Sequence, residues 1–308
     1  MSAQQHQLSP ADALKYRGFQ LAEAALRRGG GAGLALAPVA GRLAYLLAMP
    51  QRRAVEANLR VLLPAASDAE IRRLASGVFS SVTRYYVELM RLPVTNLRAL
   101  HDGTEVEGYE RFEAARAAGR GVVVASIHLG PAEIVLQAFG VRGVHYTAMV
   151  ERLRPPELNQ LFLDVRQMRG QRYVFADVAG ARALLRALRG GGVVALLIDR
   201  DLNRSGIEVP FAGGVIRAPT GIIELARASG APLFPTVAQW TPGGMRAIFM
   251  PPLSIGREIR GAEATRRALA ELLDRFVPYL RAHPEQWVVL ERLFVARRRS
   301  AGAAYTEA

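Results

Sequence analysis

The chain has no cysteine, a single lysine and only five histidines among its 308 residues. The absence of cysteine excludes disulfide bonds, thiol nucleophiles and cysteine metal sites. With so few histidines, a multi-histidine metal site is not expected either. We therefore predict no metal site, and the candidate catalytic groups have to be sought among the remaining side chains.

A long uninterrupted apolar run is also missing. The most apolar stretch, residues 29–50, is broken by Gly33, Pro38 and Arg42, which is unfavourable for a membrane-spanning helix. The first ten residues show no pattern of a cleaved signal peptide. We expect an interfacial helix that docks on an anionic bilayer through its apolar side and the flanking arginines, or a helical layer that covers the core, and both can hold.

The charge is strongly unbalanced, with a formal net charge of +13 that comes almost entirely from arginine. Such a charge favours an anionic partner, which can be nucleic acid, an anionic membrane surface or a phosphorylated substrate. The sequence contains no zinc finger, RNA-binding aromatic signature or obvious recognition helix. We therefore predict no nucleic-acid partner and favour the membrane surface or the phosphate-bearing substrate.

Hydrophobic residues make up 50% of the chain, which is enough to bury a sizeable core. After a helical first third, in which Ser67 is a predicted N-cap, strands and helices alternate and end in a helix predicted over residues 264–287. This order predicts an α/β fold with a central, mostly parallel sheet flanked by helices. The predicted parts are a disordered start at 1–10, an N-terminal helical layer at 11–99, the α/β core at 100–296 and a basic, disordered tail at 297–308.

The most informative stretch is residues 121–140. The short β-branched run over residues 122–125 predicts a buried strand, and helical spacing follows from Pro131 onward. His128 therefore lies at a strand-to-helix junction, where open α/β sheets place ligands. Glu133, five residues later, can return to the imidazole and make His128 a general base. Equally, His128 can merely cap the helix while Glu133 faces solvent.

A second charged run follows another apolar strand, at the same edge of the predicted sheet. It contains Asp199, Arg200, Asp201 and Arg204. Two acids that alternate with two arginines can form an ion-pair network that shapes a pocket. A solvated turn is the simpler explanation for any one of these charges, but it is less convincing for the whole run.

Read together, these stretches resemble the bacterial acyltransferases that include lipid A late acyltransferases and phosphatidylinositol mannoside acyltransferases. The segment HLGPAE at 128–133 resembles the family's H-x-x-x-x-D/E element, and DRDLNRSGIEVPFAG at 199–213 resembles its second signature. The blocks at 149–162 and 283–294 resemble flanking family blocks. The second signature is most similar to that of the phosphatidylinositol mannoside branch. Pro131 and Ala132 replace the Asn and aromatic that family members often carry.

The resemblance implies a fold like that of glycerolipid acyltransferases and transfer of a long acyl chain from acyl-CoA or acyl carrier protein to a glycolipid hydroxyl. The thioester is a substrate, so no resident cofactor is implied. His128 would deprotonate the hydroxyl, Glu133 would orient His128, and Glu208 would support them. The enzyme would be a peripheral protein on the cytoplasmic face of the plasma (inner) membrane.

The resemblance also implies substrate-binding residues. Arg152 and Arg166 match family arginines and are candidates for the anionic carrier or an acceptor phosphate, although either can be a helix surface charge. The run at 199–204 would form the pocket floor. Its members are Asp199, Arg200, Asp201 and Arg204.

Three alternatives stay open at this point. The first is an acyltransferase with another acceptor, such as a lipid A-like saccharide, an aminolipid or a lysophospholipid. The second is a catalytically silent lipid-binding protein with the same fold, although the presence of both His128 and Glu133 argues against it. The third is a nucleic-acid-binding protein, which should show salt-dependent DNA affinity and no acyl turnover.

Overall fold

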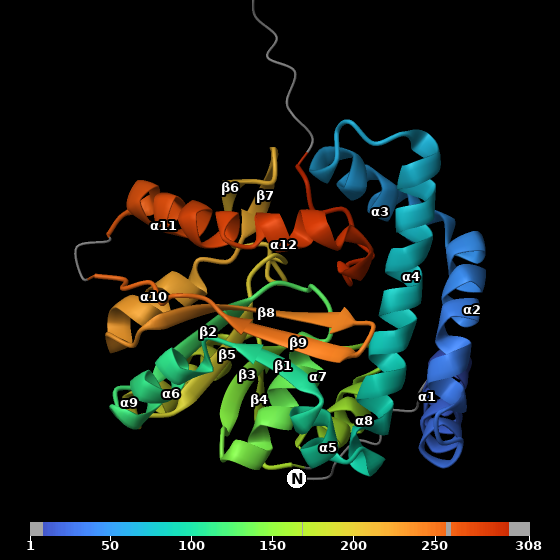
Figure 1. Cartoon of the computed structure of the whole chain (residues 1–308), viewed down its shortest axis with the longest axis horizontal. Coiled ribbons are helices and arrows are strands. Elements are labelled where there is room, and N and C mark those ends of the chain that lie inside the picture. Colours follow the sequence, from blue (N-terminus) through green and yellow to red (C-terminus); the bar gives the residue numbers. More distant parts are fainter. Residues whose placement is uncertain (1–8, 168, 257–259, 296–308) are drawn as a thin grey trace, which may run out of the picture.

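The computed structural model describes residues 9–295 apart from residue 168 and residues 257–259. The disorder predicted for 1–10 and 297–308 lies outside these residues, except that Ser9 caps and Pro10 begins the first helix. The predicted division into parts stays a prediction. The α/β class with a mostly parallel sheet flanked by helices is confirmed (Figure 1).

The core is a seven-stranded sheet in the order β1-β9-β8-β2-β5-β3-β4. All neighbouring pairs are parallel except β8 and β9, which are antiparallel. The strands are β1 (Thr104–Glu107), β2 (Val122–Ser126), β3 (Tyr146–Val150), β4 (Arg172–Phe175), β5 (Val193–Leu197), β8 (Leu233–Thr241) and β9 (Gly244–Phe249). A separate antiparallel hairpin consists of β6 (Ile207–Phe211) and β7 (Gly214–Ala218).

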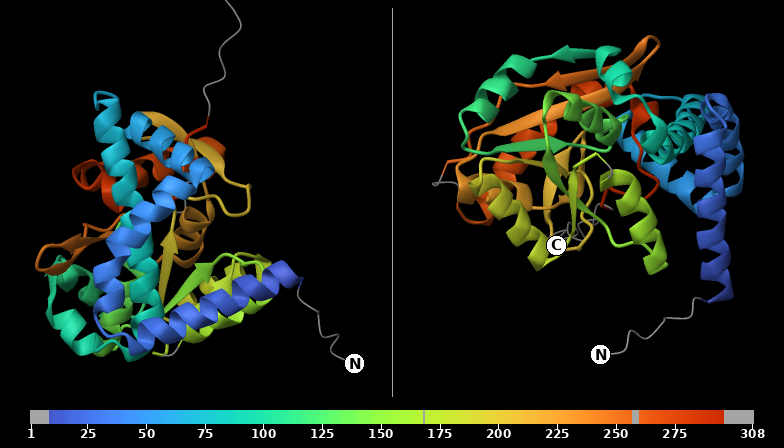
Figure 2. Two further views of the ribbon diagram at one scale, coloured as in Figure 1. Left: turned by 90° about the vertical axis from the view of Figure 1, so that its right-hand side faces the viewer. Right: turned by 90° about the horizontal axis from the view of Figure 1, so that it is seen from below.

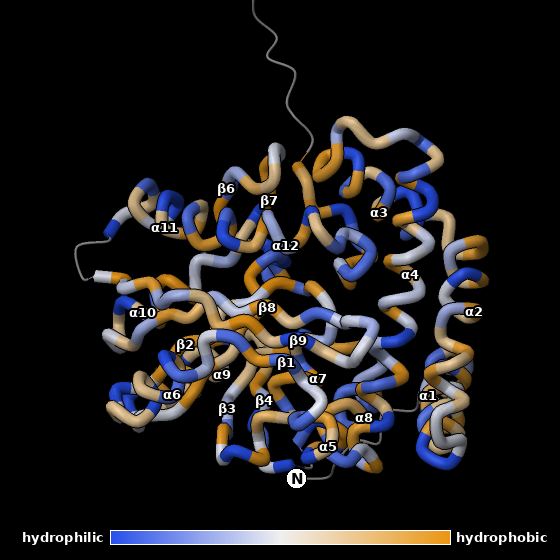
Figure 3. Tube along the Cα trace, viewed as in Figure 1, coloured by the Kyte–Doolittle hydropathy of each residue, from blue (hydrophilic) through white to orange (hydrophobic). Residues whose placement is uncertain are grey.

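Strand β2 is the centre of the molecule, and every one of its residues is buried. Its run of valines is buried on both faces because helices cover both sides of the sheet. Val122 and Val124 face one core, and Val123 and Ala125 face the other. The strand predicted over 122–125 is thus confirmed, and Figure 3 shows the apolar residues gathered in the sheet.

One side of the sheet carries α6 (Tyr109–Ala117), α7 (Ala132–Ala138), which continues into η2 (Phe139–Arg142), and α8 (Pro156–Gln167). The other side carries α9 (Val178–Arg189), α10 (Gly221–Ser229), α11 (Ala262–Asp274) and α12 (Val277–Ala282), followed by η3 (Pro284–Gln286). The single helix predicted over 264–287 is therefore wrong. It is broken at residues 275–276 because Pro278 has no N–H for a continuing helix and is tolerated in the first turn of α12.

The N-terminal third is helical, with α1 (Pro10–Arg28), α2 (Ala32–Leu47), α3 (Met49–Leu62), α4 (Asp68–Arg91), η1 (Leu92–Val94) and α5 (Leu97–Asp102). The predicted cap at Ser67 is confirmed, since its side chain accepts a hydrogen bond from the N–H of Glu70. Helix α2 packs so closely on α4 that a Cβ on Gly41 would lie 2.4 Å from the Ser80 Cα. Helices α1 and α2 form one outer side of the molecule (Figures 1 and 2).

Candidate active site

The site begins where β2 ends. His128 lies two residues after the last residue of β2, and Gly130 turns the chain toward α7 with a φ of +63°. A side chain at Gly130 would place its Cβ 2.3 Å from the Ala238 carbonyl oxygen, so this turn requires glycine. The prediction that His128 lies at a strand-to-helix junction is confirmed.

The segment near residue 287 forms backbone hydrogen bonds with this loop. The Val288 N–H donates a 2.7 Å hydrogen bond to the His128 carbonyl, and the Gly130 N–H donates to the Gln286 carbonyl at 2.8 Å. The buried side chain of Asn58 in α3 secures the same segment through the Glu291 carbonyl and the Leu293 N–H. The His128 backbone is therefore fixed on both sides.

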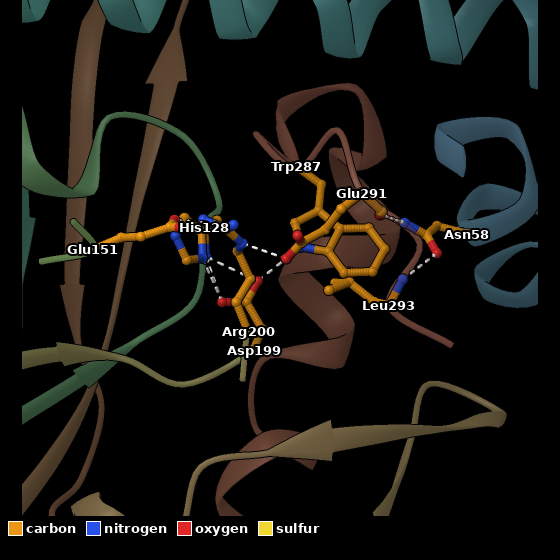
Figure 4. A network of polar contacts seen from close by, with 8 residues as sticks. All are labelled: Asn58, His128, Glu151, Asp199, Arg200, Trp287, Glu291 and Leu293. Atoms are coloured by element: carbon orange, nitrogen blue, oxygen red, sulfur yellow. Dashed lines mark hydrogen bonds and ion pairs between the residues drawn. The ribbon is translucent and has the colours of Figure 1, made fainter. Parts of the chain in front are cut away.

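The imidazole of His128 is paired with Asp199. The two strands β2 and β5 are parallel neighbours with Ser126 opposite Leu197, so two further residues on each strand bring His128 beside Asp199. The distance from His128 Nδ1 to Asp199 Oδ1 is 2.6 Å, and the His128 N–H also donates to this carboxylate. Trp287 Nε1 donates to Asp199 Oδ2 at 2.9 Å (Figure 4).

This environment keeps Asp199 ionised. Asp199 is fully buried, which by itself raises its pKa, but the charge of His128 and the hydrogen bonds from His128 and Trp287 together hold the pKa below its ordinary value. An ionised carboxylate only accepts hydrogen bonds, so Nδ1 of His128 carries the proton in this pair. The lone pair of the neutral ring is then on Nε2.

The ring is placed to use that lone pair. The side chain of His128 is 21% exposed and lines a cavity of about 940 Å³. Within the described residues, no protein group hydrogen-bonds its Nε2. The arrangement can therefore accept a proton from a hydroxyl that enters the cavity.

Glu133 does not contact His128 as the spacing suggested. Its carboxylate instead accepts from Arg166 Nε at 2.7 Å and from the Tyr85 hydroxyl at 2.5 Å. Arg166 comes from α8 and is only 15% exposed, so its charge requires a buried counter-ion, which Glu133 supplies. Burial raises the pKa of Glu133, but the charge and hydrogen bonds of Arg166 lower it by more. The pKa of Glu133 therefore lies below its ordinary value.

Arg200 and Asp201 lie at the cavity, as expected for the run at 199–204. The Arg200 guanidinium bridges two carboxylates, with Nε 2.5 Å from Glu291 Oε1 and Nη2 3.4 Å from Glu151 Oε2 (Figure 4). Asp201 accepts from the backbone N–H groups of two residues in the following turn and so shapes that turn. Asp199 is not pocket floor, because the imidazole binds it.

The remaining predicted residues lie outside the cavity lining. Glu208 is exposed on β6 because Val209, its neighbour, points into the core. Arg152 stacks on Phe175 and pairs with Asp177 at 2.8 Å on the surface. Arg204 is in an exposed turn. The roles expected for these three residues have no support from the geometry.

The sequence interpretation missed Trp287, although it lies in the block HPEQW that carried part of the resemblance, and it did not connect Tyr85 with Glu133. A buried indole N–H usually has a hydrogen-bond acceptor, so a buried tryptophan indicates that a polar group is near. The sequence does not indicate which polar group it is. Within residues 9–295, apart from the four positions not described, no group of three or more His, Asp or Glu side chains could hold a metal ion.

The cavity is predominantly apolar and lies against the sheet under α7. The sheet contributes small side chains there, which leave room for a ligand. These are Val124, Ser126, Ala148, Ala195, Thr236, Ala238 and Ala247. The aromatic rings of Phe139 and Phe249, which are in contact with each other, also line the cavity. A predominantly apolar cavity of this volume can hold an alkyl chain.

Comparison with known proteins decides the family. The model of the bacterial lipid A biosynthesis acyltransferase family matches residues 34–296. The chain belongs to this family. A phosphatidylinositol mannoside acyltransferase of Mycobacterium tuberculosis (strain CDC 1551 / Oshkosh) is 35% identical over 246 residues, which are 78% of this chain and 76% of the relative.

Two further relatives are similar to this acyltransferase over most of its length. A phosphatidylinositol mannoside acyltransferase of Mycolicibacterium smegmatis is 32% identical over 234 residues, 72% of this chain and 73% of the relative. A lipid A biosynthesis lauroyltransferase of Escherichia coli (strain K12) is 27% identical over 282 residues, 86% of both chains. The acyltransferase thus resembles enzymes named for two kinds of lipid, phosphatidylinositol mannosides and lipid A.

The N-terminal helices of this acyltransferase differ from membrane-spanning helices in length and composition. In the described part of the chain, no single helix has the length and apolar character to cross a membrane. Helices α2 and α3 meet these criteria together, but they are bent by 99° where they join.

Proposed function

We propose that this acyltransferase moves a long acyl chain from acyl-CoA or acyl carrier protein to a hydroxyl of a glycolipid such as a phosphatidylinositol mannoside. The observation that supports this most directly is the His128 and Asp199 pair at the wall of a large apolar cavity. The mannoside acceptor is favoured over a lipid A-type saccharide by the 35% identity to the mycobacterial enzyme. The pairing of a buried carboxylate with a histidine at the cavity argues against a member without catalysis, because such pairs are concentrated at catalytic sites.

In the proposed reaction, Nε2 of His128 takes the proton of the acceptor hydroxyl as its oxygen attacks the thioester carbonyl. Asp199 holds the ring in the Nδ1–H tautomer and stabilises the imidazolium that forms. Collapse of the tetrahedral intermediate breaks the carbon–sulfur bond, and the imidazolium returns its proton to the leaving thiolate. The products are an ester and a free thiol, so no acyl-enzyme is required.

The apolar cavity would hold the acyl chain of the donor. Glu133 and Arg166 line its wall and are proposed to act on the reaction only by keeping α7 and α8 in place. Arg200 is proposed to bind an anionic group of a substrate, since it lies at the cavity and the two glutamates that pair with it are about half exposed.

The outer side formed by α1 and α2 is proposed to dock on the cytoplasmic face of an anionic inner membrane as a peripheral contact. It presents many exposed large apolar side chains, an arrangement typical of an interfacial surface. These are Leu14, Leu21, Leu36, Val39, Leu43, Leu46 and Leu47. Arginines on the same helices can attract anionic lipid headgroups.

The test is thiol release from palmitoyl-CoA by the wild-type protein and by His128→Ala, with and without a crude polar-lipid extract. Mass spectrometry of the lipids would identify the acceptor. We expect release that depends on the extract and is lost in the variant. His128→Ala removes the ring that binds the buried carboxylate of Asp199, so its melting temperature is expected to fall, and both proteins are assayed below the melting temperature of the variant. Equal release by the variant would overturn the assignment of the base, and no release from CoA or carrier-protein donors would favour the lipid-binding alternative.

A further inference from the structure

The cavity has a second branch on the opposite face of the sheet. Successive residues of a strand point to opposite faces, yet both Ala195 and Leu196 of β5 line the cavity. Ala195 belongs to the core under α7, whereas Leu196 packs against the core on the side of α9 and α10. Met149 of β3 lies on this second side as well. The cavity therefore passes around the carboxyl edge of β5, where the charged run begins.

The second branch is bounded by α9 and α10, which pack against each other. Its walls are apolar and consist of Ala181, Leu184, Leu185, Ile222, Leu225 and Ala228. Polar groups follow at its rim, namely Arg182, Asn203, Ser205 and Glu224. The backbone at Gly221 adds open space, because a Cβ there would have no neighbour within 4 Å. The branch suits an extended ligand that has both apolar and polar groups.

Helix α9 presents a row of uncompensated positive charge beside this branch. Arg182, Arg186 and Arg189 are exposed, and no ion pair or hydrogen bond joins their side chains to another group in the described part of the chain. Many other arginines of the protein are paired with acids, as are Arg152 and Arg200. The helix dipole accounts for basic residues in the last turn of α9 but not for Arg182, which lies earlier.

The location of this row also matters. Helices α9 and α10 lie on the side of the sheet away from α1 and α2 (Figures 1 and 2). A protein that rests on a bilayer through α1 and α2 leaves α9 open to water. The branch is thus accessible to a water-soluble substrate while the lipid substrate approaches from the membrane.

We propose that the branch between α9 and α10 binds the phosphopantetheine arm of the acyl donor, with its phosphate at Arg182 and Arg186. The arm combines amide groups with a branched apolar segment, which matches the apolar walls and polar rim. The acyl chain would then lie under α7, and the thioester would lie at the carboxyl edge beside His128. Arg189, about 10 Å along the helix from Arg182, would face the remaining anionic groups of the carrier. This proposal rests on the proposed function.

Charge reversal on α9 gives a sharp test. The variant carries Arg182→Glu and Arg186→Glu, and the matched control carries Arg98→Glu and Arg281→Glu on the exposed surfaces of α5 and α12. Each variant would be assayed with palmitoyl-CoA, palmitoyl-acyl carrier protein and palmitoyl-N-acetylcysteamine, which lacks the phosphate. We expect the α9 variant to lose about tenfold or more of kcat/KM with a phosphate-bearing donor and little with the short thioester.

The donors distinguish the sources of the arm. A loss with both CoA and carrier protein identifies the shared phosphate, and a loss with one alone identifies the donor that uses this branch. An equal loss with all three thioesters, or a loss no greater than in the control, would overturn the proposal. If the wild type transfers from none of the donors, the proposed function itself fails.

A second variant tests the branch rather than the charge. Ala181→Trp would narrow the branch from the exposed side of α9, so the fold should be kept. We expect a higher KM for palmitoyl-CoA at an unchanged preference among acyl chain lengths. A shifted chain-length preference would mean that the branch holds an acyl chain, which would contradict the proposal.

Discussion

The indole of Trp287 donates a hydrogen bond of 2.9 Å to the carboxylate of Asp199, on the oxygen that the His128 ring does not use. Both oxygens of this buried acid therefore have a side-chain donor. In the proposed reaction the indole would act only through Asp199, so we propose Trp287 as a positioning residue. It limits the rotation of the carboxylate and thereby the orientation of the imidazole.

Trp287→Phe is expected to lower kcat about tenfold and leave the KM for the acyl donor nearly unchanged, because a hydrogen bond to a charged group is lost. The chain offers a matched control. Trp240 Nε1 donates to the buried carboxylate of Glu88, away from the imidazole. Trp240→Phe should lower the melting temperature without a comparable loss of kcat. If both variants lose kcat equally, Trp287 has no special role.

Asp199→Asn and Glu133→Gln distinguish the two candidate partners of His128. The structure predicts a loss of kcat on the order of a thousandfold for Asp199→Asn, because an amide no longer selects the Nδ1–H tautomer. Glu133→Gln should mainly lower stability, since its carboxylate binds Arg166. Initial rates and thermal unfolding of both variants check this. A larger kcat loss in Glu133→Gln would restore the pairing that the sequence spacing suggested.

The stability of the protein should fall in acid partly because of Glu133. Its pKa in the folded protein is below the ordinary value, so its contribution is present above the unfolded pKa of about 4.3 and is lost as the pH falls through the folded pKa. Wild type should exceed Glu133→Gln by about 3 kcal/mol in unfolding free energy at neutral pH, because the substitution leaves the buried charge of Arg166 without its counter-ion. Urea titrations from pH 7 to pH 3 should show this gap narrowing. A gap that widens in acid would contradict the direction of the shift.

The exposed leucines of α2 should govern vesicle binding. Changing Leu36, Leu43 and Leu47 to glutamate is expected to weaken binding to vesicles with anionic lipid by at least about tenfold, since each leucine contributes through apolar burial. Val94→Glu is the control, because Val94 is also exposed but lies in η1. Co-sedimentation at constant ionic strength measures both. Equal binding of wild type and the α2 variant would place membrane contact elsewhere.

The position of His128 could be predicted from the sequence, but its partner could not. The run at 122–125 and the helical spacing after Pro131 are local signals, and they fix a strand, a junction and an edge. The pairing with Asp199 depends on β2 and β5 being neighbours in a given register, which is a contact across 71 residues. Spacing along the chain favoured the nearer acid, Glu133. That acid was bound by Arg166, whose burial is a property of the packed helices.

For the helix predicted over residues 264–287, the local pattern indicated more continuity than the structure has. Its apolar spacing continues through residues 264–287, so the pattern alone predicts one element. The break near Phe276 is set by Pro278 together with the packing of α12 against the core. The segment after α12 then reaches the His128 loop, a contact that no local pattern indicates.

The hydrogen bonds between residues 286–288 and the His128 loop have a consequence for biosynthesis. His128 and Asp199 emerge from the ribosome before the segment that carries Gln286, Trp287 and Val288, which fixes the loop and the carboxylate. A nascent chain can therefore form much of the sheet before the His128 ring and its carboxylate partner are held in position. Activity should arise late in translation, and a product cut before residue 286 should be folded in part but inert.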